Sequence, residues 1–371
     1  MNKILSFFKS QAVLCISGIA CIISCFFVTP DKQYIGYIDF NTLILLFCLM
    51  LSVGGLKASG AFTAISNRLL SGNVSIFKIS MALVTVCFFT SMIITNDVAL
   101  LTFVPLTLIL LDVKGYEKSL AMVVILETVA ANLGSMLTPI GNPQNIYLYE
   151  YYDMSIVSFF KAILPLGFLS FIIVFMALAL IPKKDDILPT DHMDSEFELQ
   201  KTKLIVSVIM IAVCLLSVFN ILPHKWCIVI CYFLALFFMP TSIKSVDWAL
   251  LVTFVFFFIF SGNIARIDAV STFLQNAIEK RELFVAFLAS QVISNVPAAC
   301  LLSGFTENGV SLLQGVNIGG LGTPIASLAS LISLKIYSKA KGADSKSYLL
   351  KFLGVNFSIA IVLVVFTVIF I

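Results

Sequence analysis

The chain contains one polar phrase twice, and each copy lies inside a hydrophobic segment. Residues 132–145 read NLGSMLTPIGNPQN and residues 317–330 read NIGGLGTPIASLAS, with Asn, Gly and Thr-Pro-Ile at matching offsets. Proline and glycine interrupt helices, and a backbone polar group freed in hydrocarbon is costly unless protein or water surrounds it. Each copy therefore predicts a membrane helix that is broken at a protected place inside the protein.

Two further pairs of segments repeat in the same order. SMIITNDVALLTFVPL at 91–106 resembles SQVISNVPAACLLSGF at 290–305, and the step IDF at 38–40 corresponds to VDW at 246–248. Three matches in one order indicate an internal duplication. Interrupted hydrophobic segments at corresponding positions of two halves point to a transporter's binding site. The alternative is that the prolines only bend packed helices while Asn and Thr side chains bond across them.

The composition restricts the chain to one broad class. Of its 371 residues 60% are hydrophobic and only 12% are charged, whereas soluble domains carry about 25% charged residues. Apolar runs of membrane-spanning length recur throughout, so the chain is predicted to be a polytopic membrane protein. The basic residues lie in loops between spans, which argues against nucleic-acid binding. The nine cysteines lie mostly in apolar segments, without metal-ligand spacing to the two histidines, and are interpreted as small, buried, reduced side chains.

Two apolar segments are too short to cross the membrane twice. The arms of 79–112 have about 15 residues on either side of the polar step, so a re-entrant hairpin is expected there, and a second one at 283–305. Broken helices are expected at 118–150 and 311–337. Unbroken spans are predicted at 11–29, 41–56, 155–181, 204–221, 226–239, 248–262 and 349–371, and interfacial amphipathic stretches at 61–70 and 266–280.

Loop charges predict the orientation of the spans. Lys-bearing loops, such as those with Lys57, Lys114 and Lys183, are expected in the cytoplasm, and the loops with Glu150 and Glu307 outside. The N-terminus is then cytoplasmic and the C-terminus external, with nine full crossings. Each half supplies four crossings, and the odd span between the halves turns the second half upside down.

The predicted domains follow from this count. Residues 1–181 form the first repeat, residues 182–225 a polar loop and a connecting span, and residues 226–371 the second, inverted repeat. The fold class is therefore an all-α polytopic membrane protein: an inverted-repeat secondary transporter with two re-entrant hairpins and two broken helices, whose hairpin tips meet near the midplane.

The residues at the tips and breaks are the predicted substrate and ion site. Half-helix N-termini offer free amides to an anion, while carbonyls and hydroxyls can coordinate a cation. The predicted site residues are Thr95, Asn96, Asp97, Asn132, Thr138, Gly141, Asn142, Pro143, Ser294, Asn295, Asn317, Thr323, Ala326 and Ser327.

Two acidic residues lie at membrane depth, where a carboxylate is expensive and suggests function. Asp97 is expected to act as a cation ligand or proton carrier, and the alternative places it at the tip in water as a helix N-cap. Glu127 either relays protons or bonds a neighbouring helix. Asp39 and Asp247 stand before spans and are interpreted as helix caps.

The phrases ITNDVALLTFVPL, ANLGSMLTPIGNPQN, ISNVPAACLLSGF and NIGGLGTPIASLASL resemble the ion transporter superfamily over about residues 35–180 and 225–371. This superfamily includes arsenite permeases, D-type sodium/proton antiporters, citrate permeases and divalent anion/sodium symporters. The resemblance implies that 95–97 and 294–296 replace the symporters' Ser-Asn-Thr tips, and that 141–143 and 326–328 replace their breaks. It also implies a homodimer that moves by an elevator mechanism.

Two departures from the symporter pattern bear on the substrate. Asp97 stands where a substrate-binding Thr would be, and Val296 lacks the matching hydroxyl. A negative tip repels a di- or tricarboxylate unless a cation neutralises it, so the pattern is nearer the arsenite permeases and antiporters.

The function expected from the sequence is secondary active transport of a small anion or oxyanion, coupled to sodium or protons by alternating access. The nearest alternative is a sodium/proton antiporter. An intramembrane enzyme would need a motif such as His-Glu-x-x-His, which the sequence lacks, and a channel would need rings of like residues. The expected partners are a small anionic or inorganic solute, the lipid bilayer and a second copy of the chain. No cofactor is expected beyond the coupling Na⁺ or H⁺.

Overall fold

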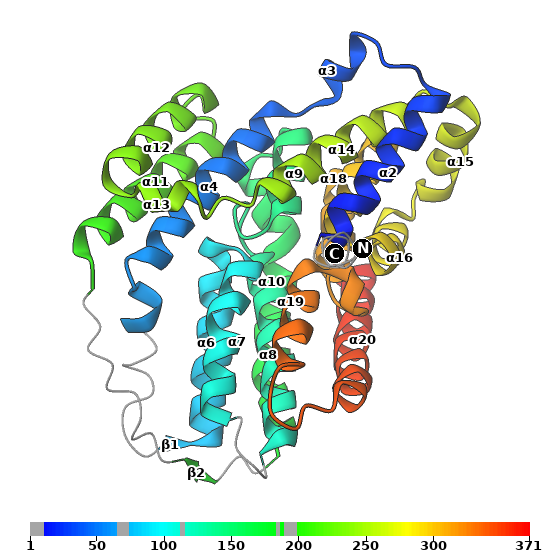
Figure 1. Ribbon diagram of the computed structural model, residues 1–371. Helices are drawn as coiled ribbons and strands as arrows, with labels where there is room; N and C mark the ends of the chain where they lie inside the picture. The colour runs from blue at the N-terminus through cyan, green and yellow to red at the C-terminus, as the bar shows by residue number, and fades with distance from the viewer. Residues whose placement is uncertain (1–10, 65–73, 112–115, 183–185, 189–198) are drawn as a thin grey trace, which may run out of the picture.

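The computed structural model describes residues 11–64, 74–111, 116–182, 186–188 and 199–371, and these residues are almost entirely helical (Figure 1). The first half contains α2 (Ala12–Phe27), α3 (Gln33–Tyr37), α4 (Phe40–Ala58), α6 (Ile76–Ile94), α7 (Asn96–Leu111), α8 (Glu117–Ser135), α9 (Pro143–Tyr151), α10 (Ile156–Ala177) and the 3-10 turn η1 (Leu178–Leu180). The short strands β1 (Val74–Ser75) and β2 (Ile187–Leu188) pair antiparallel. The all-α prediction is confirmed.

The second half repeats this order. It contains α11 (Lys201–Val218), α12 (His224–Phe238), α13 (Pro240–Ile243), α14 (Trp248–Ala265), α15 (Asp268–Ile278), α16 (Glu282–Ile293), α17 (Asn295–Leu302), η2 (Ser303–Phe305), α18 (Gly309–Gly319), η3 (Pro324–Ala326), α19 (Leu328–Tyr337) and α20 (Ser345–Phe370).

Seven helices are long and apolar enough to cross a membrane, in the described part of the chain: α4, α6, α8, α10 with η1, α11, α14 and α20. Their outer faces carry exposed apolar side chains such as Ile172, Val252 and Val365, as a surface in contact with lipid does. The chain is therefore a multi-pass membrane protein. The first hairpin arm is longer than expected, because α6 has 19 residues rather than about 15. The amphipathic stretch predicted at 61–70 lies outside the described residues beyond position 64.

Aspartates cap the equivalent helices α4 and α14 of the two repeats, as the sequence suggested. The Asp39 carboxylate accepts a hydrogen bond from the Thr42 amide at 3.1 Å, and Asp247 accepts one from the Leu250 amide at 3.0 Å. These bonds satisfy amides that would otherwise lack a partner at the starts of α4 and α14.

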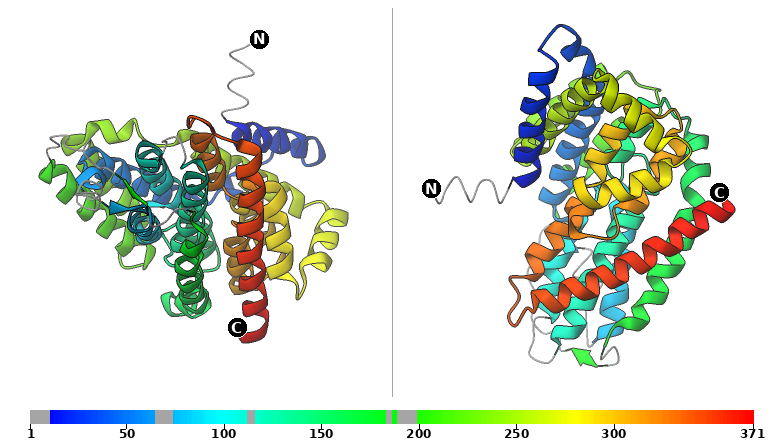
Figure 2. Two further views of the ribbon diagram at one scale, coloured as in Figure 1. Left: turned by 90° about the horizontal axis from the view of Figure 1, so that it is seen from below. Right: turned by 90° about the vertical axis from the view of Figure 1, so that its right-hand side faces the viewer.

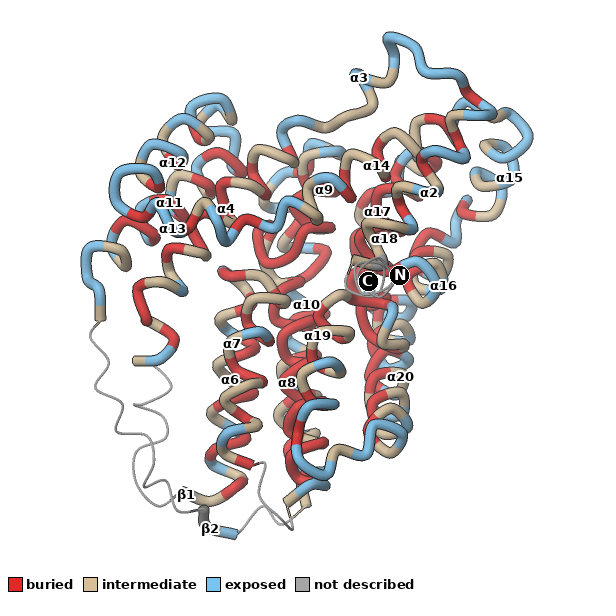
Figure 3. The backbone as a smooth tube through the Cα atoms, viewed as in Figure 1, coloured by how far each residue is buried: buried red, intermediate tan, exposed pale blue. Residues whose placement is uncertain are grey.

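The helices form two bundles. The framework bundle consists of α2, α4, α11, α12 and α14, in which α2 packs on α14 of the second repeat, and α12 packs on α4 of the first. The hairpin bundle consists of α6–α10 and α16–α20, built around the almost fully buried α8 (Figure 3). Helix α20 runs along one outer face of the molecule (Figure 2). The exchanged packing of α2 and α12 ties the two repeats together.

The two hairpins open toward opposite ends of the molecule. The α6–α7 hairpin has its base at the end where α8 begins (Figure 1). The base of the α16–α17 hairpin lies at the other end, beside the end of α9, where the Tyr152 hydroxyl donates to the carbonyls of Ser303 and Thr306 at 3.1 and 2.9 Å. Because α8 and α9 form one broken crossing between these ends, the repeats are inverted, as predicted.

Glycines bring each broken helix against its hairpin. A Cβ atom on Gly134 would lie 2.6 Å from Ser91 Oγ and 2.0 Å from the Phe88 carbonyl oxygen, and one on Gly319 would lie 2.6 Å from Ser290 Oγ, the equivalent of Ser91. These contacts are equivalent in the duplication, so α8 meets α6 as α18 meets α16. Gly134 faces backbone, which cannot rotate away.

We expect Gly134→Ala to lower the free energy of unfolding by about 1–3 kcal/mol, the usual cost of overpacking. The effect should appear as a lower midpoint of thermal denaturation of the purified protein in detergent. Gly354→Ala is the matched control, because a Cβ atom at Gly354 in α20 meets nothing within 4 Å. Equal midpoints for the two variants would contradict the close packing of α8 on α6.

Candidate functional site

The two hairpin tips have the same unusual backbone conformation. Thr95 has φ 68° and ψ 150°, and Ser294 has φ 74° and ψ 152°. A positive φ is strained for residues with a Cβ atom and costs about 1–3 kcal/mol. Each residue ends one hairpin arm and begins the next, so each tip exposes both kinds of helix terminus. The duplicated polar steps therefore form duplicated tips.

Asn132 in the last turn of α8 joins three elements. Its Oδ1 accepts hydrogen bonds from Asn96 Nδ2 at 2.9 Å and from Ser327 Oγ at 3.0 Å. Its Nδ2 lies 3.4 Å from Ser330 Oγ and 3.5 Å from the Gly320 carbonyl. The first hairpin tip, the first broken helix and the second break meet at this amide.

Asn317 in the last turn of α18 has the corresponding role. Its Oδ1 accepts a hydrogen bond from Asn142 Nδ2 at 3.0 Å, and its Nδ2 donates to Asn145 Oδ1 at 2.7 Å. Asn142 Oδ1 also caps α9 by accepting from the Asn145 amide at 2.9 Å. The side-chain amide of Asn132 therefore binds the break of the second repeat, and the side-chain amide of Asn317 binds the break of the first.

Ser135 joins these two groups of contacts, because its hydroxyl accepts from Asn142 Nδ2 at 3.3 Å and donates to the Asn132 carbonyl at 2.9 Å. We call the side chains of the two groups together the amide network: Asn96, Asn132, Asn142, Asn145, Asn317, Ser327 and Ser330. Each of these side chains is at most 4% exposed. Helices α7, α9 and α19 begin at the network, and helices α8 and α18 end there. Helix N-termini carry partial positive charge and free amides, so they favour an anion or an oxygen-rich solute.

The two threonines of the repeated phrase face the hairpins instead of the network. Thr138 donates to the Met92 carbonyl, and Thr323 Oγ1 donates to the equivalent Gln291 carbonyl at 3.0 Å. Both were predicted as site residues. In this structure their hydroxyls join the breaks to the hairpin arms.

The remaining predicted residues line the breaks. Gly141 passes so close to Ser135 that a Cβ atom would lie 2.1 Å from its carbonyl oxygen, and Pro143 begins α9. The Ala326 carbonyl accepts from Ser294 Oγ at 3.5 Å. Asn295 lies beside Gly320, where a Cβ atom would be 2.9 Å from its Nδ2.

Asp97 lies at the first tip, where its backbone amide, and not its carboxylate, bonds the amide network. It is in the first turn of α7, half-buried, and its amide donates to Asn96 Oδ1 at 3.0 Å. Asn96, not Asp97, begins α7, so Asp97 is not the N-cap that the alternative interpretation proposed.

Glu127 is buried on α8, away from the hairpin tips. One carboxylate oxygen accepts from Thr107 Oγ1 at 2.7 Å and lies 4.0 Å from Cys87 Sγ. The other oxygen has no hydrogen-bond partner among the described residues. Glu127 therefore bonds its neighbouring helices α6 and α7, and it retains one free buried oxygen.

Three polar residues of this region were missed by the sequence prediction. Asn145 and Ser330 are the last residues of the two copies of the repeated phrase, so their matching positions were a usable signal. Gln291 bonds the Gly319 and Leu321 carbonyls at 3.0 and 2.9 Å and accepts from the Thr323 amide. Its first-repeat equivalent is Met92, so the duplication did not mark it.

The bundles meet mainly at one end. Helix α9 packs on α4, while α17 and η2 pack on α14. The duplication relates these contacts to the pairs α19–α14 and α7–α4, which pack less closely. At this end Glu150 of the hairpin bundle bonds His224 of the framework at 2.9 Å.

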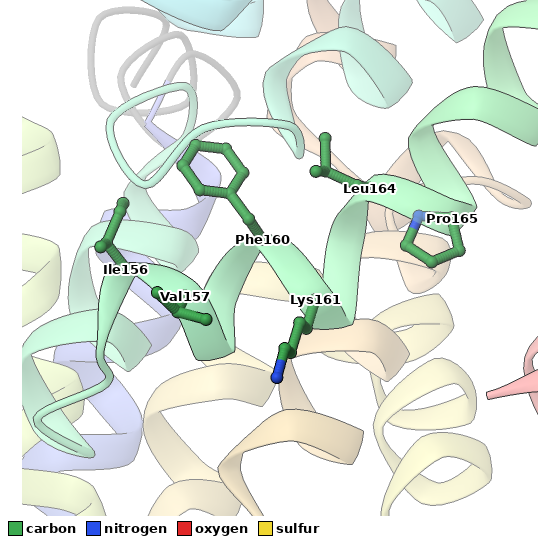
Figure 4. A pocket seen from close by; sticks show the side chains of 6 residues that line it. All are labelled: Ile156, Val157, Phe160, Lys161, Leu164 and Pro165. Carbon is green, nitrogen blue, oxygen red and sulfur yellow. The ribbon is translucent and has the colours of Figure 1, made fainter.

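An open hollow on α10 lies apart from the amide network (Figure 4). Its lining residues are Ile156, Val157, Phe160, Lys161, Leu164 and Pro165. They belong to one helix, and Val157 and Leu164 are 58% and 53% exposed. The hollow is part of the outer, apolar face of α10.

Comparisons with known proteins identify a family of transporters. Residues 3–308 match the family model described as citrate transporter. An uncharacterized transporter of Methanocaldococcus jannaschii is 34% identical over 81% of both chains, and the inner membrane protein YbiR of Escherichia coli is 31% identical over 84% of both. A silicon efflux transporter of Oryza sativa subsp. japonica is 33% identical over 37% of this chain and 28% of its own.

Proposed function

The chain belongs to the citrate transporter family, and we propose that this membrane transporter is a secondary active carrier of a small anion or oxyanion, coupled to sodium or protons. The observation that carries the proposal is the amide network. Two Asn residues from opposite repeats each bind the break of the other repeat, at the termini of half-helices. A solute bound there would contact both repeats at once, as alternating access requires.

The chemistry of the network favours a small, oxygen-rich solute. Amide N–H groups, hydroxyls and helix N-termini donate hydrogen bonds to oxygen atoms. The network contains no Lys or Arg to neutralise several carboxylates, and Asp97 adds negative charge at one tip. A small oxyanion or a small neutral hydroxylated species therefore suits the site better than citrate. The Oryza relative is named a silicon efflux transporter.

The uneven packing of the bundles supports alternating access. In this structure α9 and α17 close the end of the molecule at which the Glu150 loop was predicted to be external. Transport would break these contacts and form the equivalent ones, of α7 with α4 and of α19 with α14, at the other end. We propose that the hairpin bundle moves against the framework in an elevator-like step, in a homodimer whose N-terminus is cytoplasmic.

A sodium/proton antiporter is the second candidate, favoured by two acids at membrane depth. Asp97 and Glu127 both lie in the hairpin bundle, and neither forms an ion pair among the described residues. Such an exchanger would need no organic or oxyanion substrate.

A ligand panel separates these functions. We expect the purified protein to gain thermal stability with a small oxyanion such as arsenite, phosphate or sulfate, or with silicic acid, because a ligand that binds only the folded form stabilises it by mass action. At 100 times its dissociation constant the gain is about 2.7 kcal/mol. Citrate, with and without sodium, serves as the comparison, and the panel is repeated at several pH values. Stabilisation by sodium or protons alone, whatever the anion, would favour the antiporter.

We expect Glu127→Gln to keep substrate binding but to change the pH dependence of transport if Glu127 relays protons. Gln can accept from Thr107 but cannot carry a proton between sites. The measurement is solute uptake into proteoliposomes across a range of imposed pH gradients. Thr107→Val is the control, because it removes the hydrogen bond and keeps the acid. An unchanged pH profile for Glu127→Gln would assign Glu127 a structural role.

A further inference from the structure

Four cysteines from three helices gather inside the framework bundle. They are Cys48 of α4, Cys214 of α11, and Cys227 and Cys231 of α12, and all four are 0% exposed. The sulfur atoms of Cys48, Cys227 and Cys231 lie within 4.8 Å of one another, and Cys214 Sγ lies 4.0 Å from Cys231 Sγ. The sequence predicted small, buried thiols and gave no sign that they meet, because α4 is distant from α11 and α12 in the chain.

The geometry of this cysteine cluster is close to that of a metal thiolate centre. Cys227 and Cys231 are four residues apart, so both face the same side of α12. In a tetrahedral zinc site the metal–sulfur distance of about 2.3 Å places the sulfur atoms about 3.8 Å apart. Among Cys48, Cys227 and Cys231 the separations exceed this by at most about 1 Å, which is within reach of side-chain rotation. Cys214 lies outside that group of three and approaches it through Cys231, at 4.0 Å.

We propose that Cys48, Cys214, Cys227 and Cys231 bind one soft divalent metal ion, Zn²⁺ or Cd²⁺, between α4, α11 and α12. Thiolates prefer soft ions of this kind. The ion would cross-link three framework helices, one of which belongs to the first repeat. This site is separate from the amide network, because it lies in the other bundle and contains no residue of the breaks or tips.

Polar side chains lead from the cluster to the end of α12, where an ion could enter. His224 lies one turn before Cys227 on α12, and its Nδ1 lies 3.2 Å from the Ser217 hydroxyl of α11. His224 Nε2 in turn lies 2.9 Å from Glu150 Oε2. Imidazole and carboxylate groups are ordinary zinc ligands. They could pass an ion inward to the thiols, which would release protons as they bind it.

A second cysteine pair provides a matched control. Cys21 and Cys25 have the same four-residue spacing on α2, the helix that packs on α14 as α12 packs on α4. They lie on a single helix, and among the described residues no cysteine of another helix completes a group of three with them. If spacing on one helix were sufficient, this pair would bind metal as well.

The test is Cd²⁺ binding by the purified, reduced, full-length protein, followed by the ultraviolet charge-transfer band of cadmium–thiolate bonds. We expect one Cd²⁺ per chain. Cys48→Ser and Cys231→Ser should each weaken Cd²⁺ binding strongly. The loss should exceed the factor of about 10–100 that is typical of substitutions next to, but not among, the metal ligands. Cys21→Ser and Cys300→Ser should bind as the unmodified chain does. Zn²⁺ should compete for the site and raise the thermal midpoint of the unmodified chain.

Several results would overturn the proposal. These are a missing charge-transfer band in the unmodified chain, a band that survives in both cluster variants, or a band that disappears in Cys21→Ser. A Cys214–Cys231 disulfide found by mass spectrometry in protein prepared from membranes would also overturn it. If a Ser variant does not fold, Cys48→Ala and Cys231→Ala replace it, with folding checked by the thermal midpoint in the absence of metal. If the unmodified chain binds Cd²⁺ at this site but transports none of the solutes of the ligand panel, the proposed function is wrong and the metal site still stands.

Discussion

Replacing Asn132 by Ala is expected to reduce transport by about 100-fold. The substitution removes the acceptor of Asn96 and Ser327 and the donor toward Ser330. Three buried hydrogen bonds, each contributing about 1 kcal/mol, correspond to roughly two factors of ten in rate. The measurement is initial uptake into proteoliposomes with the solute found by the ligand panel.

The control for this substitution is a buried asparagine outside the network. Asn356 is 0% exposed in α20, and its Nδ2 donates within its own helix to the Phe352 carbonyl at 2.9 Å. Asn356→Ala therefore tests the effect of deleting a buried amide as such. Equal losses in the two variants would mean that burial, and not the network, explains the effect.

The equivalent residue of the second repeat, Asn317, gives a second test of the two-repeat site. Asn317→Ala should lose transport to a similar extent as Asn132→Ala, because it breaks the equivalent bonds to Asn142 and Asn145. If one variant is inactive while the other transports normally, a single repeat forms the binding site, and the two-repeat site is wrong.

Replacing Asp97 by Asn is expected to abolish the dependence of transport on the coupling cation or on pH. Asn keeps the size of the side chain and one acceptor oxygen, but it replaces the second oxygen by an NH₂ donor and removes the charge that would bind Na⁺ or the proton that would be carried. Uptake would then be driven only by the solute gradient. The measurement compares uptake with and without an imposed sodium or proton gradient.

Asp39→Asn is the matched control for this charge removal. Asp39 is also an aspartate of the first repeat, but its carboxylate caps α4 through Thr42. Its replacement should lower stability slightly, since Asn is also a good cap, and should leave coupling unchanged. Coupling that persists in Asp97→Asn would remove Asp97 from the ion path and leave Glu127 as the remaining acid.

The duplication made the local structure predictable. A break in the middle of a hydrophobic segment depends on nearby residues. Here Pro139 lacks the amide donor of a helix and Gly141 loosens the backbone, so the helix is interrupted where protein surrounds the freed backbone groups. The paired tips at Thr95 and Ser294, the caps Asp39 and Asp247 and the inverted order of the helices all follow from such local signals. The inversion follows from the predicted number of crossings, because one odd span between the two halves turns the second half upside down.

Contacts between distant segments were not predictable in the same way. The sequence placed Thr138 and Thr323 in the site, but whether a hydroxyl faces the centre or the hairpin depends on how α6 and α16 pack against the breaks. Asp97 and Glu127 were both identified as acids at membrane depth, and the structure separates them. Asp97 is at a tip, while Glu127 lies between α7 and α6.

The sequence by itself determined that this protein is a duplicated, inverted membrane bundle with four interrupted segments, because helix breaks and spans depend on residues close together in the chain. Only the tertiary structure decided that Asn132 binds the second break and Asn317 the first, and that four thiols from α4, α11 and α12 meet. The physical reason is that hydrogen bonds and sulfur contacts depend on distances of a few ångströms between side chains, and packing of whole helices sets those distances.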